Sequence, residues 1–377
     1  MINNKKTFLF VTGTRADFGK IKSIINKFED HFECYIFVTG MHLVKKYGYT
    51  VNEILLTCRK SKIYKFNNQS LSNNLDTIFS KTVNGFSKYL KKIKPDLVIV
   101  HGDRIETLAA AITCSVNNYL VAHIEGGELS GSIDEPIRHA VSKLCHLHFV
   151  SNNDARQKLL NMGENQKHIF VVGSPDFDMM KDSALPKIEE VKTKYNIIFD
   201  NYAVSILHPV TINKNTKKEY TKYFNSLIDS NLNYLIIYPN NDPGNDVIIS
   251  LIKKLLKNKK QFKILPSMRF EYFLRVLKNS IFIIGNSSAG IREAPYFGLG
   301  TINVGDRQNG RFNSKSIKNV NFNSKNIASA IKLIKGKKYT KNYYFGNSGS
   351  SKKILKTVNS KFFWKTSLQK KFYTYDM

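Results

Sequence analysis

The sequence is poor in cysteine, and its few cysteines are widely spaced. Only four occur in 377 residues, and no CxxC pair is among them: Cys34, Cys58, Cys114 and Cys145. A disulfide-stapled scaffold and a structural zinc site both need cysteines at short, repeated spacings. We therefore expect reduced, mostly buried thiols and no metal ion.

Long apolar stretches are also missing. No run approaches the roughly 20 apolar residues that a membrane-spanning helix needs. The N-terminal Met1–Lys6 leads straight into a short strand pattern at Thr7–Thr12, which is not the core of a signal peptide. The sequence therefore predicts a cytoplasmic protein without a membrane partner.

Acidic residues are scarce beside basic ones. Lys and Arg number 58 against 29 Asp and Glu, which gives a formal net charge of +29. The excess is nearly all Lys and is spread along the chain, without the basic-aromatic repeats or zinc spacings of nucleic-acid-binding modules. We expect solvated basic faces with a general attraction for anions such as nucleotides, and no nucleic-acid partner.

The glycine signature GxGxxG of dinucleotide-binding enzymes is missing too, which argues against a nicotinamide cofactor. The first strand pattern is followed instead by Gly13-Thr14-Arg15-Ala16-Asp17-Phe18-Gly19, which opens a helix. A helix N-terminus has unpaired N–H groups and a partial positive charge, so Arg15 beside it suits a phosphate. The alternative is a plain strand-to-helix turn with a solvated arginine.

Strand and helix patterns alternate from end to end. Such alternation predicts parallel sheets in an α/β fold, here two doubly wound Rossmann-like domains facing across a cleft. A polar stretch near 181–200 separates them. We expect an N-terminal domain over 1–180, a second domain over 181–355, and a C-terminal segment, 356–377, that packs back on the first domain. The expected strands are 7–12, 34–38, 96–100, 119–123, 147–150, 169–172, 204–207, 234–237, 262–265, 281–284 and 301–304.

Ionisable residues gather after two successive strands of the first half. The carboxyl ends of parallel strands meet at one edge of a sheet, where ligands of open α/β sheets bind. We therefore expect an active site here, against the alternative of solvated loop charges. The residues are Asp103 and Arg104 after the strand 96–100, His123, Glu125 and Glu128 with the next strand, and Asp134, Arg138 and His139 beyond.

The second half offers a phosphate cradle at Gly285-Asn286-Ser287-Ser288-Ala289-Gly290-Ile291-Arg292-Glu293. Ser287 and Ser288 are expected at a helix N-terminus, where hydroxyls and N–H groups can hold a diphosphate without a Walker lysine. Glu293, about one and a half turns on, could accept both ribose hydroxyls. The alternative is that Ser287 only caps the helix.

Two further loops end strands of the second half. His208-Pro209-Val210-Thr211 follows the strand 204–207, and His208 is expected to face the cleft, although a single histidine is more often structural. Asn240 lies in Asn240-Asn241-Asp242-Pro243-Gly244, which has the composition of an ordinary turn. In a cleft, this loop would add polar side chains beside a nucleotide.

These motifs together resemble the hydrolysing UDP-N-acetylglucosamine 2-epimerase family of sialic acid and legionaminic acid biosynthesis. The resemblance covers essentially the whole chain and implies a glycosyltransferase-B-like fold, with the first domain on the sugar side, the second binding the nucleotide, and a C-terminal helix crossing back. It also implies a UDP-sugar substrate, no cofactor or metal, and a homodimer or homotetramer. The motifs that carry it are 13–17, Thr39-Gly40-Met41-His42, His101-Gly102-Asp103-Arg104, His123–Gly131, Ile137-Arg138-His139, 208–211, Gly285–Ser288 and Gly305-Asp306-Arg307-Gln308.

The resemblance also implies roles. The family eliminates UDP across C1–C2 of the sugar and then hydrates the glycal, which needs acids and bases near C2. The implied catalytic residues are Asp103, Glu125 and Asp134, with Glu128 near them. The implied binding residues are Arg15, His208, Ser287, Ser288 and Arg307 for the diphosphate, Glu293 for the ribose, Asn240 and the backbone near Met268 for the nucleotide, Arg104 for sugar or phosphate, and His42, Arg138 and His139. Gly19 replaces a serine of the animal enzyme and leaves only a backbone contact.

Other interpretations stay open at this point. The same chemistry on UDP- or GDP-N,N'-diacetylbacillosamine is the nearest, because Ile63–Phe66 and Val83–Ser87 resemble that branch, whereas Ala289–Ala294 resembles the sialic acid type. A non-catalytic sugar-nucleotide-binding module or a glycosyltransferase is the alternative of another class. The sequence leaves open the sugar, UDP against GDP, the C2 base, oligomer size and feedback control.

Overall fold

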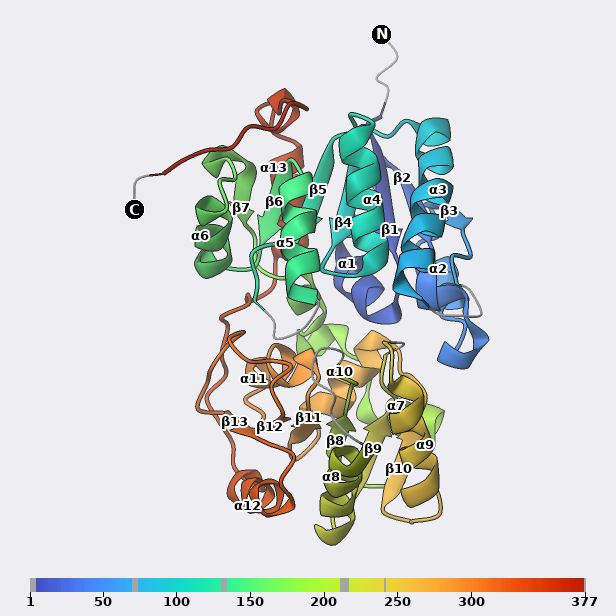
Figure 1. Ribbon diagram of the computed structural model, residues 1–377, viewed down its shortest axis with the longest axis vertical. Helices are drawn as coiled ribbons and strands as arrows, with labels where there is room; N and C mark the ends of the chain where they lie inside the picture. Colours follow the sequence, from blue (N-terminus) through green and yellow to red (C-terminus); the bar gives the residue numbers. More distant parts are fainter. Residues whose placement is uncertain (1–4, 70–73, 130–133, 211–216, 241, 376–377) are drawn as a thin grey trace. The chain divides into compact units, whose positions relative to one another are not determined.

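Buried strands rich in aliphatic and aromatic residues alternate with amphipathic helices in a computed structural model of the chain (Figure 1). The structure describes residues 5–69, 74–129, 134–210, 217–240 and 242–375, so parts of two motifs, 130–131 and Thr211, lie outside the described residues. The chain divides into two units. Unit 1 contains the described residues up to Glu128, Asp134–Lys181 and those from Tyr344 on, and unit 2 is formed mainly by Asp182–Tyr343.

A parallel sheet organises unit 1. Among the described residues it has seven strands in the order β3-β2-β1-β4-β5-β6-β7, and every neighbouring pair is parallel. All carboxyl ends therefore share one edge of the sheet. The strands are β1 (Thr7–Thr12), β2 (Glu33–Val38), β3 (Lys62–Lys65), β4 (Leu97–His101), β5 (Val121–Ile124), β6 (Leu147–Val150) and β7 (Ile169–Val171).

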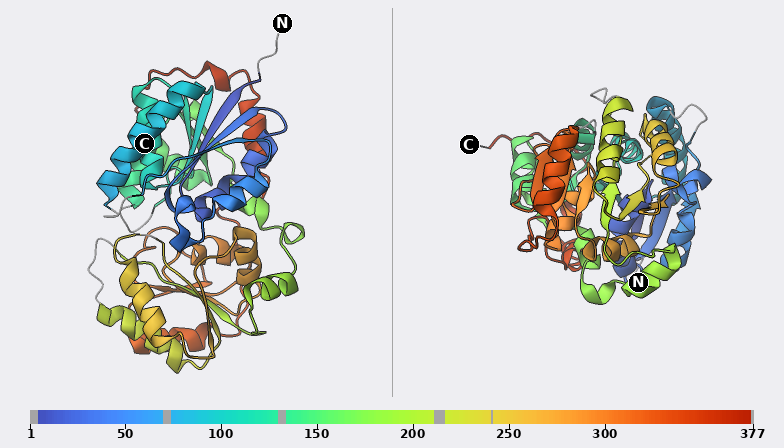
Figure 2. Two further views of the ribbon diagram at one scale, coloured as in Figure 1. Left: turned by 90° about the vertical axis from the view of Figure 1, so that its right-hand side faces the viewer. Right: turned by 90° about the horizontal axis from the view of Figure 1, so that it is seen from below.

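Helices cover both faces of this sheet (Figures 1 and 2). Alternate residues of β1 point to opposite faces: Phe8 and Phe10 join one core with α1, α2 and α13, and Leu9 and Val11 join another with α3, α4 and α5. The helices of unit 1 are α1 (Arg15–Phe28), α2 (Val51–Thr57), α3 (Leu75–Ile93), α4 (Ile105–Val116), α5 (Asp134–Leu144), α6 (Asn153–Asn161) and α13 (Ser350–Val358).

Unit 2 repeats this architecture with its own cores. Its described strands follow the order β10-β9-β8-β11-β12-β13, all parallel, which is the strand order of mononucleotide-binding α/β folds. The strands are β8 (Ala203–Ile206), β9 (Tyr234–Ile237), β10 (Phe262–Leu265), β11 (Ile283–Gly285), β12 (Thr301–Val304) and β13 (Ile317–Val320). The helices are α8 (Lys217–Asp229), α9 (Asn245–Leu255) and α12 (Ser324–Ile334) on one face, and α7 (Ile188–Tyr195), α10 (Phe270–Lys278) and α11 (Glu293–Tyr296) on the other.

The structure confirms the two doubly wound domains, but two strands escaped the sequence prediction. β3 and β13 are the edge strands of their sheets. Each is short and largely exposed or half-buried, so neither shows a buried apolar run. The predicted cleft between the domains stays a prediction.

The C-terminal helix belongs to unit 1. The chain rejoins that unit at Tyr344, ahead of the boundary at 356 expected from the sequence. Ile354 and Val358 of α13 pack into the core beside α1. The carboxylate of Asp178 accepts the first N–H groups of α13, from Ser350 at 2.9 Å and Ser351 at 2.8 Å, which fixes the start of this helix.

Two expectations from composition can be compared with the structure. All four cysteines are buried and unpaired, as predicted. None of the helices in the described residues is both long enough and apolar enough to span a bilayer.

Candidate active site

Glu125 is the centre of a buried cluster at the carboxyl edge of the unit 1 sheet. It directly follows β5 and is 3 % exposed. The hydroxyl of Ser174 donates to its Oε1, and Oε2 lies 3.3 Å from Nε2 of His101 and 3.4 Å from Nζ of Lys20. Its φ of 64° is in the left-handed region, which costs a residue with a Cβ about 1–2 kcal/mol. Such backbone strain concentrates at functional sites.

Lys20 joins Glu125 to a second buried carboxylate. Its Nζ lies 3.6 Å from Oδ2 of Asp176, whose side chain is fully buried. Two carboxylates and one ammonium group lose their hydration when buried, and only short distances between the opposite charges can offset this cost. The ammonium group of Lys20 therefore lies between two buried carboxylates at the sheet edge.

Asp103 lies in a second cluster with Arg138 of α5. The Nη2 atom of Arg138 is bonded to Oδ2 of Asp103, and Nη1 donates to the carbonyl of Glu128 at 3.1 Å. Arg138 is 2 % exposed, whereas the side chain of Asp103 is 22 % exposed. The Glu128 carboxylate accepts from the Ser151 hydroxyl at 2.9 Å. Asp103 is thus the carboxylate of this cluster that solvent, and therefore a ligand, can reach.

His123 braces the loop that presents Asp103. Its Nε2 lies 2.8 Å from the carbonyl of Gly102, and its Nδ1 lies 3.0 Å from the Ser142 hydroxyl on α5. Burial lowers the pKa of His123 to about 3, against the opposing effect of the Gly102 carbonyl. His123 is therefore neutral at physiological pH and positions its neighbours.

The start of α1, where the sequence predicts a phosphate site, carries an internal acid. The carboxylate of Asp17 accepts the N–H groups of Gly13 and Thr14, both at 3.0 Å, in a capping box. The Nε of Arg15 pairs with Glu53 at 3.2 Å. Asp17 therefore occupies these two N–H groups, and phosphate binding by Arg15 stays a prediction. Gly19 lies inside α1, where helical hydrogen bonding uses its N–H, which argues against the expected backbone contact.

His42 is enclosed beneath this loop. Its side chain is buried, with Nε2 3.0 Å from the Thr12 hydroxyl and Nδ1 2.6 Å from the Thr50 hydroxyl. Burial lowers its pKa to about 4, although Asp17 opposes the shift. This geometry favours a role in holding the loop over the expected contact with substrate.

The remaining expected residues of unit 1 lie on or beside α4 and α5. Arg104 occupies the N-cap position of α4 without a side-chain cap hydrogen bond, and its Nε lies 3.7 Å from the buried Glu106 carboxylate. Asp134 is the first residue of α5. On the same helix, Nε2 of His139 lies 3.8 Å from Glu135. The structure therefore brings Asp103, Glu128 and Arg138 into direct contact and places Asp134 and His139 on the helix that carries Arg138.

In unit 2, Asn286 joins three segments. It is fully buried after β11 and pairs with the backbone of His208, accepting from its N–H at 2.7 Å and donating to its carbonyl at 2.9 Å. The Asn286 carbonyl accepts from Arg307 at 3.3 Å and from Gln308 at 3.1 Å. The Nδ1 atom of His208 in turn accepts from the N–H of Asn240 at 3.1 Å. The loops after β8, β9, β11 and β12 are thereby linked.

The serines of unit 2 lie on a shorter helix than the sequence predicts. Ser287 caps a single 3-10 turn, Ser288–Gly290, accepting from the Ala289 N–H at 3.3 Å. A separate short helix, α11, begins at Glu293, which is 3 % exposed. The predicted continuous helix is wrong, because Gly290 and Pro295 interrupt it. Ser287 and Ser288 are half-buried, so ligand can reach them.

Two other expected residues flank this region. Met268 is 5 % exposed and packs in the core between β10 and α10. The Asn240 amide donates to Asp242 at 2.5 Å, which tightens its turn.

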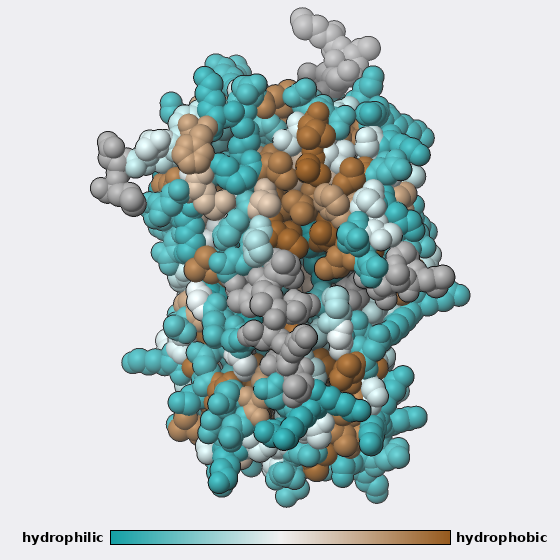
Figure 3. Space-filling view, viewed as in Figure 1, coloured by the Kyte–Doolittle hydropathy of each residue, from teal (hydrophilic) through white to brown (hydrophobic). Residues whose placement is uncertain are grey.

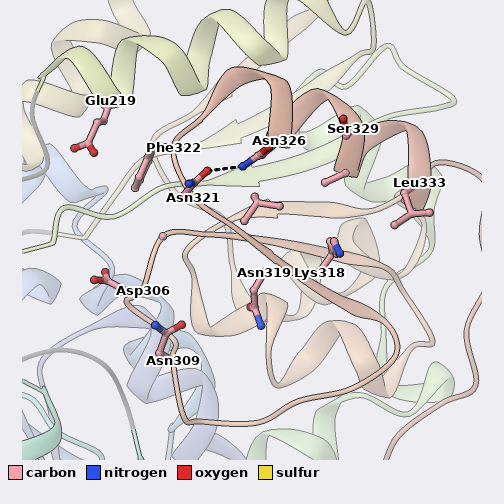
Figure 4. A pocket seen from close by; sticks show the side chains of 13 residues that line it. Glu219, Asp306, Asn309, Lys318, Asn319, Asn321, Phe322, Asn326, Ser329 and Leu333 are labelled. Atoms are coloured by element: carbon pink, nitrogen blue, oxygen red, sulfur yellow. Dashed lines mark hydrogen bonds between the residues drawn. The ribbon is translucent and has the colours of Figure 1, made fainter.

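A separate hollow of about 880 Å³ lies beside β13 and α12 (Figure 4). Its lining includes the polar residues Asp306, Asn319 and Ser329 and the apolar residues Phe322 and Leu333, and the expected binding residues are not among the residues that line it. Asn326 donates to Asn321 at 2.9 Å at its rim. Within the described chain, no group of three or more His, Cys, Asp or Glu side chains could hold a metal ion.

Several residues of the two clusters were not predicted as site residues. Lys20 follows the first loop by one residue, and Ser174 and Asp176 follow β7. Ligands of open α/β sheets bind at the carboxyl ends of the strands, and the same reasoning that located Asp103 could have found Ser174 and Asp176. Asn286 and Gln308 stood inside quoted motifs, but nothing in the sequence shows that their amides join separate loops.

Comparison with known proteins places these observations in context. A family model described as UDP-N-acetylglucosamine 2-epimerase matches residues 26–359. A UDP-N-acetylglucosamine 2-epimerase of Neisseria meningitidis serogroup B is 42 % identical over 374 residues, covering 97 % of this chain and 98 % of the relative. A Legionella pneumophila protein named UDP-N,N'-diacetylbacillosamine 2-epimerase (hydrolyzing) is 33 % identical over 365 residues, covering 94 % of this chain and 96 % of the relative.

A solved structure shares the fold. The Methanocaldococcus jannaschii UDP-GlcNAc 2-epimerase in complex with UDP-GlcNAc and UDP matches with a TM-score of 0.81 and 23 % identity, covering 93 % of this chain and 99 % of that chain.

Proposed function

The chain belongs to the UDP-N-acetylglucosamine 2-epimerase family, and we propose that it is the hydrolysing kind, which converts UDP-N-acetylglucosamine and water to N-acetylmannosamine and UDP. The higher identity to a relative named for UDP-N-acetylglucosamine, 42 % against 33 % for the diacetylbacillosamine relative, supports this sugar. The hydrolysing outcome rests on the resemblance of His123–Gly131 to that branch. The product suits the biosynthesis of sialic acids.

The observation that carries the proposal is the buried Glu125 cluster beside Asp103. Abstraction of the weakly acidic C2 proton needs a fixed carboxylate in a site with little water. Glu125 has that burial, and Lys20 and His101 lie against its Oε2. Asp103 adds a carboxylate that solvent reaches.

In the first proposed step, a carboxylate takes the C2 proton while the C1–O bond breaks and its electron pair leaves with UDP. The candidates are Asp103, Glu125 and Asp134, with Glu128 close by. A C1=C2 double bond remains in the sugar. Carboxylates can also stabilise the positive character that develops at the ring.

In the second step, water adds across that double bond. The hydroxyl goes to C1, and a proton goes to C2 on the face opposite to the one it left, which inverts C2. Acid and base roles exchange between the steps, as in carboxylate pairs of glycoside hydrolysis. Free N-acetylmannosamine and UDP result, without any metal or redox cofactor.

We assign nucleotide binding to unit 2. Ser287, Ser288, His208 and Arg307 would hold the diphosphate, because hydroxyls, a ring N–H and a guanidinium group suit its oxygens. Glu293 would accept from the ribose and Asn240 would lie beside the nucleotide. Arg104, Arg138 and His139 stay proposed contacts of the sugar or phosphate in unit 1.

Product analysis in heavy water tests this proposal. The purified protein is incubated with UDP-N-acetylglucosamine and, separately, with UDP- and GDP-diacetylbacillosamine, and the sugars are identified by NMR. We expect free N-acetylmannosamine deuterated at C2, together with UDP. UDP-N-acetylmannosamine as the stable product would defeat the hydrolytic assignment. If only a diacetylbacillosamine nucleotide is turned over, that sugar replaces N-acetylglucosamine as the proposed substrate.

We also propose a homo-oligomer that is formed through α4. Leu108, Ile112 and Val116 recur on one side of this helix, Val116 is 71 % exposed, and its one charged residue, Glu106, is buried. Figure 3 shows hydrophobic side chains over the face of unit 1 that carries α4 and α5. A helix without a polar outer face is typical of a buried interface.

Light scattering during size-exclusion chromatography tests the oligomer. We expect a dimer or tetramer that dissociates in Val116→Lys, because a charge would enter the apolar contact. Leu333→Lys, which changes a 47 % exposed leucine of unit 2, is the matched control. A monomeric wild-type protein would refute the proposal.

A further inference from the structure

The end of the described chain forms a strap on unit 1, which we define as residues 366–375. It leaves the 3-10 turn Phe363–Lys365 without regular secondary structure and runs across unit 1 towards α6, in dark red in Figure 1. The carbonyl of Leu368 lies 3.1 Å from Nε2 of His146.

The outer end of the strap is attached beyond α6. The N–H of Tyr373 donates to the carbonyl of Gly163 at 3.1 Å, and the hydroxyl of Tyr375 donates to the carbonyl of Glu164 at 3.0 Å. Gly163 has a φ of 78°, and a Cβ there would come within 2.6 Å of the Phe372 ring. A glycine therefore lets the strap lie flat against the turn after α6.

Lys370 inserts from the strap into the end of α5. Its Nζ donates to the carbonyls of Lys143 at 2.8 Å, Cys145 at 2.6 Å and Ser142 at 3.3 Å, and to Oε2 of Glu164 at 2.6 Å. The last carbonyls of a helix have no partner within it and carry its partial negative charge. An ammonium group from 225 residues along the chain thus caps α5.

Glu164 holds the ammonium group in place. Its side chain is 2 % exposed, and it also lies 2.9 Å from Nε2 of His148 and 2.7 Å from Nζ of Lys143. Burial raises the pKa of Glu164, but the hydrogen bond from His148 and the nearby charges, that of Lys370 among them, outweigh burial and lower it to about 2. Glu164 is therefore an anion that fixes Lys370 at the helix end.

The capped helix carries two side chains that hold the candidate catalytic loop. Ser142 lies at the capped end itself and contacts His123, which is bonded to the Gly102 carbonyl. Arg138, one turn earlier, is bonded to Asp103. Any displacement of the end of α5 would therefore change the position of Asp103.

We propose that Lys370 is a positioning residue that clamps the end of α5 and so fixes Asp103 through Arg138 and His123. The effect on turnover rests on the function proposed above, whereas the effect on α5 does not. The contacts of Lys370 described above all lie within unit 1, so the clamp acts on chemistry and leaves UDP affinity unchanged.

Hydrogen exchange, steady-state kinetics and UDP calorimetry on Lys370→Met test the clamp. We expect faster exchange of the α5 amides, a kcat lower by about tenfold to a hundredfold because a small displacement of a reacting group has effects of this size, and an unchanged Kd for UDP. Lys370→Arg, which keeps the charge, should restore most of the kcat. Lys371→Met, an exposed lysine next along the strap, is the matched control.

The three readouts separate the possible outcomes. Unchanged α5 exchange in Lys370→Met would overturn the clamp, and faster exchange with unchanged kcat would overturn its role in positioning. Lys370→Gln, which keeps hydrogen-bond donors without the charge, replaces the Met variant if that variant does not fold. If the protein turns over no sugar nucleotide, the proposed function fails, and the exchange data still decide whether Lys370 holds α5.

Discussion

The two parallel sheets carry candidate sites of different chemical character. In unit 1 the sheet edge is built from charged groups that compensate one another, as Lys20 does between Glu125 and Asp176. In unit 2 the corresponding edge is held by a neutral amide, Asn286, that bonds backbone groups of neighbouring loops. Two sheets with the same order of strands therefore carry edges of different chemistry: one is suited to proton transfer and the other to holding an anion.

This contrast has a physical reason. A general base must be ionisable and shielded from water, so its charge has to be compensated by other buried charges. A diphosphate brings its own negative charge, so its site needs donors and no resident acid. The loops joined by Asn286 carry Arg307 and two serines, which we propose as the donors that meet the ligand.

The largest effects should come from the carboxylates of unit 1. Asp103→Asn, Glu125→Gln and Asp134→Asn should each lower kcat by about a hundredfold to ten-thousandfold, the range for losing a general acid or base. The Kd for UDP should stay the same. Stopped assays of UDP release give the first quantity and calorimetry the second.

Glu135→Gln, next to Asp134 on α5, is the matched control and should keep near-normal turnover. Near-normal turnover in all three carboxylate variants would refute the proposal that unit 1 carries out proton transfer. Loss of UDP binding in the carboxylate variants would refute the division of proton transfer and nucleotide binding between the two units.

The next largest effect should be on nucleotide affinity. Arg307→Ala removes a charge-assisted hydrogen bond worth about 1.5–3 kcal/mol and should weaken UDP binding by roughly ten- to a hundredfold. Ser288→Ala should have a smaller effect because backbone N–H groups remain. Calorimetry measures the Kd for UDP in each variant. Lys315→Ala, which changes an exposed residue of the same loop, is the control. Unchanged affinity in Arg307→Ala would place the diphosphate elsewhere.

A third change probes the neutral amide itself. Asn286→Asp keeps the acceptor for the His208 N–H but loses the donor to its carbonyl, and it buries a charge without a built partner. We expect a loss of about 1–3 kcal/mol in unfolding free energy and weaker UDP binding. Urea unfolding and calorimetry measure the two. Full stability in this variant would show that the loops of unit 2 do not depend on Asn286.

The last prediction concerns acid, and its effect should belong to unit 1. His42 and His123 are buried there with pKa values lowered by burial to about 4 and about 3. In the unfolded chain these histidines take up protons as the pH falls below about 6.5, whereas in the folded chain they stay neutral until about pH 3 to 4. Their contribution to the free energy of unfolding is therefore complete above pH 6.5 and is lost as the pH drops towards 3 to 4. The slope approaches about 1.4 kcal/mol per pH unit for each histidine.

Trp364, the one tryptophan of the sequence, packs against the core of unit 1 and reports on that unit. Its fluorescence in urea should show an unfolding midpoint that falls between pH 6.5 and 4.5, less steeply in His42→Gln. His208→Asn in unit 2 should leave that slope unchanged. A midpoint independent of pH would mean that the buried histidines are protonated without cost.

Much of the fold was predictable because local patterns repeat. Apolar strand runs between amphipathic helices predicted both parallel sheets, and β1, β6, β9, β10 and β12 have the predicted bounds. The edge strands β3 and β13 could not be predicted in this way. The residues of these two short strands are exposed or half-buried, so their sequences carry little hydrophobic signal, whereas the edge strand β10 buries Phe262 and Leu265.

The sequence by itself determined which residues stand at the strand ends, and so placed Asp103, Glu125, His208 and Ser287 at the edges of the two sheets. The tertiary structure alone decided their partners. Asp17 accepts the N–H groups of Gly13 and Thr14, and Lys370 reaches α5 from the far end of the chain. Strand position depends on a periodicity within a few residues, whereas the partner of a buried charge depends on which distant segments share its low-dielectric surroundings.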